Sequence, residues 1–201
     1  MRMWTTAHED VSANPASQES LGLLLKILNE RTPGVLEDYN RVAHFANATA
    51  EALGLSESEV QRIEIAARLH DVGKLAIPDG ILTKAGPLDS DEWAVMRTHS
   101  EVGQRILAAA PSLAPAAKLV RSQHERYDGR GYPDRLAGEK IAIGARIIAV
   151  CAAFVAMMKK RPFSDAITVT EALAELNRCS GTQFDPEIVE VFCRLVELAS
   201  S

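Results

Sequence analysis

The chain of 201 residues combines 47% hydrophobic with 24% charged residues, which is typical of a globular protein with one sizeable core. Its formal net charge of −5 argues against a non-specific nucleic-acid binder, because such proteins carry a strongly basic surface. Residues 1–20 lack the apolar centre of a signal peptide, so we expect a cytoplasmic protein. Three cysteines without paired spacing predict buried, reduced thiols.

The predicted elements are nearly all helices, and they follow a flexible lead-in over residues 1–18. Apolar residues at helical spacing predict helices over 20–32 and 35–54. Two pairs of residues with capping-box spacing, Ser56 with Glu59 and Asp89 with Glu92, predict helices over 56–71 and 89–110. The later part of the chain adds helices over 113–124, 142–160, 165–179 and 186–199.

These predictions describe one all-α domain over residues 19–201. Its single long irregular segment, residues 125–140, is rich in glycine. A short hairpin is the most regular structure that we expect within it. Ordered loops of this length are usually functional, so we expect this segment to contribute to a site.

The longest apolar run of the chain, Ile147 to Met158, is too short to cross a membrane, because a spanning helix needs about twenty residues. Charged residues also stand at both of its ends. The run is therefore either plain core or one side of a reactive site that has lost its carboxylates.

Seven lysines and arginines lie between Lys118 and Arg146, against four acidic residues. This local excess of positive charge has two interpretations. It is either a solvated face with its loop, or a positive rim around a pocket that takes a small ligand with phosphate groups.

Three of the five histidines lie near expected helix ends, and His70 is followed at once by Asp71. A His–Asp pair at the end of a helix can point both side chains at one centre, where the carboxylate can bridge two metal ions. His99 and His124 are candidates for completing such a centre. Taken singly, each histidine is more typical of an ordinary surface or core position.

Six segments occur in an order that resembles the HD-GYP family, helical phosphohydrolases that cleave the bacterial second messenger cyclic-di-GMP. They are LHDVGKLAIPDGILTKAGPLDSDEW, THSEVGQRIL, HERYDGRGYPDRLAGEKI, ARIIAV, RPF and GTQFDPEIVEVF. The resemblance covers about residues 20–198. It implies a compact bundle of about seven helices with one long loop that contains Gly131-Tyr132-Pro133.

The resemblance also implies roles for single residues. Asp71 matches the bridging carboxylate and Lys74 the lysine beside the reacting phosphate, so these two are the candidate catalytic residues. Tyr132 matches a residue that lines the nucleotide pocket, and Arg161 matches a phosphate-binding arginine. The residues that match or replace metal ligands are Asp38, His70, Asp71, His99 and His124.

Several residues depart from the family pattern. Asp38 and Gln123 stand where the family usually has histidines, and Ala152 replaces a metal-binding aspartate. Asp38 can still ligate a metal, but its side chain is shorter. These departures favour the interpretation of the apolar run as an eroded site, and they predict lower metal occupancy and slower turnover.

We therefore expect a cyclic-di-GMP signalling domain with impaired or absent phosphodiesterase activity, which acts by binding the nucleotide or a protein. The alternative is an active metal-dependent phosphodiesterase with a reduced ligand set. The expected metal is iron or manganese, with one or two ions at reduced affinity, or none. The GYP loop could dock a partner such as a diguanylate cyclase, and neither nucleic acid nor membrane is an expected partner. A structural bundle with relict histidines is a third interpretation.

Overall fold

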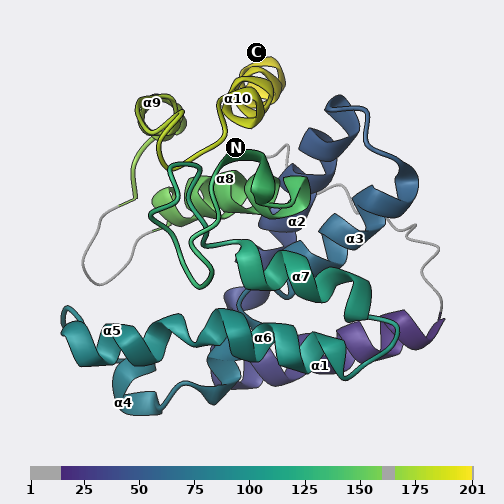
Figure 1. Cartoon of the computed structure of the whole chain (residues 1–201), viewed down its shortest axis with the longest axis vertical. Coiled ribbons are helices and arrows are strands. Elements are labelled where there is room, and N and C mark those ends of the chain that lie inside the picture. Colours follow the sequence, from purple (N-terminus) through teal and green to yellow (C-terminus); the bar gives the residue numbers. More distant parts are fainter. Residues whose placement is uncertain (1–14, 160–165, 201) are drawn as a thin grey trace.

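The structure is a computed structural model that describes residues 15–159 and 166–200. Within these residues the chain forms ten α-helices and two short 3-10 helices, and it contains no strand (Figure 1). The elements are α1 (Pro15–Arg31), α2 (Val35–Ala52), α3 (Glu57–Arg68), η1 (Val72–Ala76), α4 (Asp79–Leu82), α5 (Ser90–Arg97), α6 (His99–Ala108), α7 (Ala114–Ser122), η2 (Gly138–Lys140), α8 (Ile143–Met157), α9 (Val169–Arg178) and α10 (Pro186–Ser200).

The all-α class is confirmed, and the chain has more helices than the seven that were expected. Both predicted capping boxes form at the starts of α3 and α5. The single helix expected over 89–110 is wrong, because α5 ends at Arg97 and α6 begins at His99. The hydroxyl of Thr98 donates a hydrogen bond to the carbonyl of Val95 at this junction, a local bond that competes with the helical pattern.

The core lies where α2, α8 and α10 meet. Phe45, Phe154 and Phe192, one from each helix, pack edge to face with ring centroids 5.0 to 5.6 Å apart. Helix α2 also packs on α3, and α6 packs on α7 and on η1. Figure 1 shows α9 and α10 at one end of the molecule and α1, α4, α5 and α6 at the other, with α8 between them.

The apolar run in α8 has one face in the core and another on a cavity. One face is buried core, including Ile147, Ile148 and Phe154. The other face carries small residues that line a cavity, namely Ala149, Ala152, Ala153 and Ala156. None of the described helices has both the length and the apolar character that a membrane span needs.

The three thiols are free, as expected, but only Cys151 and Cys193 are buried, because Cys179 at the end of α9 is half-buried.

Candidate metal centre and its cavity

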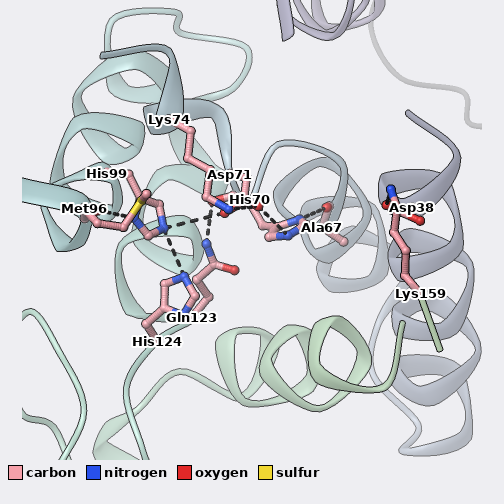
Figure 2. Close-up of polar contacts among 10 residues, drawn as sticks. All are labelled: Asp38, Ala67, His70, Asp71, Lys74, Met96, His99, Gln123, His124 and Lys159. Carbon is pink, nitrogen blue, oxygen red and sulfur yellow. Dashed lines mark hydrogen bonds and ion pairs between the residues drawn. The ribbon is translucent and has the colours of Figure 1, made fainter. Parts of the chain in front are cut away.

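Three ligand side chains from separate elements converge near the middle of the molecule. Asp71 follows α3, His99 is the first residue of α6, and His124 lies just beyond α7. One ligand atom from each can be chosen so that all three lie within 4.8 Å of one another. Figure 2 shows the side chains of this group pointing toward one another.

A glycine brings Asp71 close to His99. A Cβ atom at Gly73 would lie 1.8 Å from the backbone oxygen of His99, so only glycine allows η1 to approach α6 this closely. The sequence HDVGK therefore contains a packing requirement as well as two candidate ligands. Without that contact, the carboxylate on one side and the imidazole on the other could not share a centre.

Two imidazoles are oriented in the same way by the backbone. The Nδ1 atom of His70 lies 2.8 Å from the carbonyl of Ala67, and that of His99 lies 2.7 Å from the carbonyl of Met96. Each Nδ1 therefore carries the proton, which leaves Nε2 with a free lone pair. The His99 Nε2 atom faces the Nε2 atom of His124 at 3.0 Å and Asp71 Oδ1 at 3.6 Å.

The electrostatics keep these groups in the protonation states that bind metals. Burial lowers the pKa of His124 to about 3, and the neighbouring His99 adds to this effect. Burial also lowers the pKa of His99. Burial alone would raise the pKa of Asp71, but Lys74, together with the neighbouring His70 and His99, outweighs it and holds that pKa well below its usual range.

This donor set fits a divalent transition-metal ion. Two imidazole nitrogens and one carboxylate oxygen are borderline ligands of the kind that zinc, iron and manganese accept. In neutral rings, two facing Nε2 lone pairs repel each other unless a cation or a proton lies between them. Three protein ligands also leave coordination positions open, which is the usual composition of a catalytic metal site.

His70 lies on the other side of Asp71, with its Nε2 atom 3.4 Å from Asp71 Oδ2. The same carboxylate oxygen accepts a 2.7 Å hydrogen bond from the Nζ atom of Lys74. A second metal position here would have at most two protein ligands from this pair of residues, His70 and Asp71. It would also have to compete with the ammonium group of Lys74.

The structure does not bring Asp38 into this group. Asp38 lies on α2 and forms an ion pair with Lys159, which follows α8. Figure 2 shows the pair apart from the imidazoles, beyond His70. The side-chain amide of Gln123 donates a hydrogen bond to the backbone carbonyl of His70, so it braces that histidine's main chain. Arg161 lies outside the described residues.

A cavity of about 470 Å³ opens over the group. Its lining includes His70, Asp71, Lys74, His124 and Tyr132, and the alanine face of α8 forms another wall. Ala152 is among these alanines, so the position where the family has an aspartate faces the cavity. The ring of Tyr132 stacks on that of His124 with centroids 4.9 Å apart.

Glu125 has a role that the sequence did not indicate. Its buried carboxylate accepts hydrogen bonds from the backbone N–H groups of Asp134 and Leu136. The loop is thereby tied to the end of α7, and the expected hairpin does not form. Gly131 is needed for this path, because a Cβ there would lie 2.4 Å from the backbone nitrogen of Arg126.

The fold and the site together define an all-α protein built around a His–Asp centre suited to metal. The family model for the HD domain matches residues 22–188, so the chain belongs to the HD domain family. This match and the relatives described next confirm the resemblance predicted from the HDVGK, GYP and FDP segments.

Several curated relatives are similar over most of this chain. It is 43% identical to the cyclic di-GMP phosphodiesterase response regulator RpfG of Xanthomonas campestris, over 88% of this chain and 47% of that protein. It is 41% identical to a cyclic di-GMP phosphodiesterase of Thermotoga maritima, over 77% of this chain and 43% of that protein. It is 38% identical to 3'3'-cGAMP-specific phosphodiesterase 2 of Vibrio cholerae, over 90% of this chain and 35% of that protein. The chain thus spans about half or less of these relatives.

Two solved structures share the fold. A cyclic GMP-AMP specific phosphodiesterase of V. cholerae, V-cGAP3, superposes with a TM-score of 0.68 at 22% identity, over 90% of this chain and 49% of that one. The HD domain of L. monocytogenes phosphodiesterase PgpH, in complex with cyclic-di-AMP, gives a TM-score of 0.62 at 18% identity. The superposition covers 89% of this chain and 96% of that one. At these identities the likeness concerns the fold alone.

Proposed function

We propose that this chain is a cyclic-dinucleotide signalling domain, for cyclic-di-GMP or a related nucleotide, whose phosphodiesterase activity is impaired or absent. The main observation behind the proposal is that the two carboxylate oxygens of Asp71 have different neighbours. On the Oδ1 side stand His99 and His124, whereas the Oδ2 side has only His70 and is already bonded to Lys74. The names of the relatives support the class of ligand.

In this proposal Asp71, His99 and His124 hold one divalent ion, with iron or manganese as the expected metals. His70 is then a ligand of a second metal position, which binds its ion weakly. Such an ion, when bound, supplies Lewis-acid polarisation of a phosphoryl oxygen. Asp38 contributes no ligand in this arrangement because Lys159 neutralises its carboxylate.

The remaining residues of the cavity bind and orient the nucleotide. The ammonium of Lys74 is a point charge that can contact a phosphate oxygen, and the ring of Tyr132 forms part of the wall. A cavity of about 470 Å³ is in the range of small-molecule sites, about 300 to 1,000 Å³. Arg161 remains a predicted phosphate contact from the sequence alone.

Loss of the carboxylate at position 152 weakens the chemistry more than the binding. A phosphate group can still be held by lysine and arginine side chains, but a second ion loses a ligand and a compensating negative charge. A regulatory domain of this kind would report on the nucleotide by binding it. A protein partner such as a diguanylate cyclase at the GYP loop, and a cytoplasmic location, remain predictions from the sequence.

A second candidate function is slow hydrolysis through the one three-ligand position. Three protein ligands with open coordination positions suffice in known catalytic metal sites, and the Asp71–His99–His124 group has this composition. The difference between the two functions is therefore one of rate, and it can be measured.

The test measures binding and turnover of cyclic-di-GMP on the same preparation, with manganese or ferrous iron added. We expect calorimetric binding at micromolar concentrations and little or no product by chromatography. Slow product formation that continues over many turnovers would support the second candidate function. Absence of binding, together with absence of product, would contradict both.

A further inference from the structure

The side chain of Arg97, on α5 at the mouth of the site cavity, lies between two aromatic rings. Its guanidinium carbon is 5.9 Å from the ring centroid of Trp93 and 5.6 Å from that of Tyr132. Cation–π contacts of this kind favour Arg and fix the plane of its guanidinium group. In the described part of the chain, no carboxylate pairs with Arg97. Its position is held, but its charge is not neutralised.

Arg97 shares a second cavity, of about 440 Å³, with Arg130 and Arg135. The rest of the lining comes from the GYP loop and includes no acidic residue. Arg97, Arg130, Gly131 and Tyr132 line both cavities, so the second one adjoins that of the candidate metal centre. The ring of Tyr132 stacks on that of His124, and its centroid is 5.6 Å from the guanidinium carbon of Arg97.

The backbone at Arg135 is held in an uncommon conformation. Among the described residues it is the one non-glycine with a positive φ, 54°, which costs about 1 to 2 kcal/mol for a residue with a Cβ atom. Glu125 fixes this turn, because its carboxylate accepts hydrogen bonds from the N–H groups of Asp134 and Leu136 on either side. The strain is therefore maintained by a buried contact.

The acidic groups nearest in the chain to Arg130 and Arg135 are already engaged. The carboxylate of Asp128 is bidentate to Arg126 and also accepts the backbone N–H of Arg130. The carboxylate of Asp134 is bidentate to Arg121. Three arginines therefore line one cavity, and within the described part of the chain none of them forms an ion pair with a carboxylate. Concentrated positive charge of this kind favours binding of an anion, and guanidinium groups are suited to phosphate oxygens.

We propose that Arg97, with Arg130 and Arg135, forms an anion subsite that binds the second phosphodiester group of a cyclic dinucleotide. The first phosphodiester group then lies at Lys74 and the candidate metal centre. This inference rests on the proposed function, which supplies a ligand with two phosphate groups. It also explains one part of the local positive charge in the sequence as a rim around a pocket.

The first experiment measures affinity for cyclic-di-GMP by calorimetry. Arg97→Ala should weaken binding at least about tenfold, because a charge-assisted contact to phosphate is lost. Arg97→Lys should give a smaller loss of affinity. Lysine keeps the positive charge, but it lacks the planar guanidinium group that can form two parallel hydrogen bonds to a phosphate. The matched control is Arg105→Ala, which removes an exposed arginine of α6 and should leave the affinity unchanged.

The second experiment uses Trp93 as a reporter of the subsite. The chain has two tryptophans, so Trp4→Phe makes Trp93 the only one. Inorganic phosphate should change the fluorescence of Trp93 in this variant, and Arg97→Ala in the same background should abolish the change. The metal content should be equal in both variants, which checks that the site itself is intact.

The outcomes separate this inference from the proposed function. If the wild-type chain binds cyclic-di-GMP and Arg97→Ala binds it equally well, the subsite is wrong while the proposed function stands. If the wild-type chain does not bind cyclic-di-GMP but phosphate still acts on Trp93 through Arg97, an anion site at Arg97 stands, whereas the proposed function and the assignment of this site to a second phosphodiester group fail. A phosphate response that does not depend on Arg97 overturns the subsite in either case.

Discussion

The imidazoles of His99 and His124 face each other Nε2 to Nε2 at 3.0 Å, although they are 25 positions apart in the chain. Because the Nδ1–H of His99 donates to the carbonyl of Met96, its Nε2 lone pair points at His124. The two Nε2 atoms, beside the carboxylate of Asp71, form a place for a metal ion or for a proton that joins the two rings. This relationship defines the candidate metal centre more directly than any single residue does.

Removal of either imidazole should abolish the three-ligand group. We expect His99→Ala and His124→Ala to lower the affinity for manganese or iron at least about tenfold, because each loses a ligand itself and not only an outer partner. Metal content after dialysis against a fixed free-metal concentration measures this effect. His44→Ala is the control, since His44 is exposed on α2, and a loss of metal there would argue for a different site.

Asp38 provides a test of the structure against the sequence. The sequence made Asp38 a candidate ligand, whereas the structure pairs it with Lys159. We therefore expect Asp38→Asn to leave the metal content within error of that of the wild-type chain. A drop comparable to that of His99→Ala would mean that Asp38 leaves Lys159 and joins the site when metal is bound.

Restoring two residues of the family pattern should strengthen the site. Ala152 and Gln123 both line the cavity, so Ala152→Asp with Gln123→His adds two potential ligands to its wall. We expect at least about tenfold higher metal affinity and faster hydrolysis of cyclic-di-GMP. Ala156→Asp places the same carboxylate one turn further along the cavity wall and should give no comparable gain.

The glycine of HDVGK should be essential for stability. A Cβ at Gly73 would overlap the backbone of His99, at 1.8 Å from its oxygen, and backbone cannot move aside as a flexible side chain can. We expect Gly73→Ala to lower the free energy of unfolding by about 3 kcal/mol, at the upper end of overpacking effects. Gly80→Ala is the control for denaturant unfolding, since no atom lies within 4 Å of a Cβ there.

Glu125 should hold the GYP loop in place. Glu125→Ala leaves the N–H groups of Asp134 and Leu136 without their acceptor, and a hydrogen bond to a charged group is worth about 1.5 to 3 kcal/mol. Hydrogen exchange of these two amides should accelerate, while amides in α7 keep their protection. Unchanged exchange at both amides would mean that the loop is held by other contacts.

The helical fold could be predicted from local signals, because capping boxes and apolar spacing act within a few residues. Ser56 with Glu59 and Asp89 with Glu92 both form the predicted caps. The break between α5 and α6 could not be predicted from spacing, since the pattern continues through Thr98. The break places His99 at the first turn of a new helix.

The candidate site was only partly predictable. The family pattern pointed to His70, Asp71, His99 and His124, and the structure brings all four near one another. It did not indicate that Lys159 would pair with Asp38, because that contact joins residues 121 positions apart. Nor did it indicate the position of Arg97 between two rings, since Tyr132 comes from a distant loop.

Metal stoichiometry with turnover tests the central claim most directly. The chain, purified without chelator and loaded with manganese or ferrous iron, should hold at most one ion per chain by elemental analysis. Its hydrolysis of cyclic-di-GMP should then be at least about tenfold slower than that of the Ala152→Asp, Gln123→His variant. Two ions per wild-type chain together with rapid product formation would contradict the claim that this site is impaired.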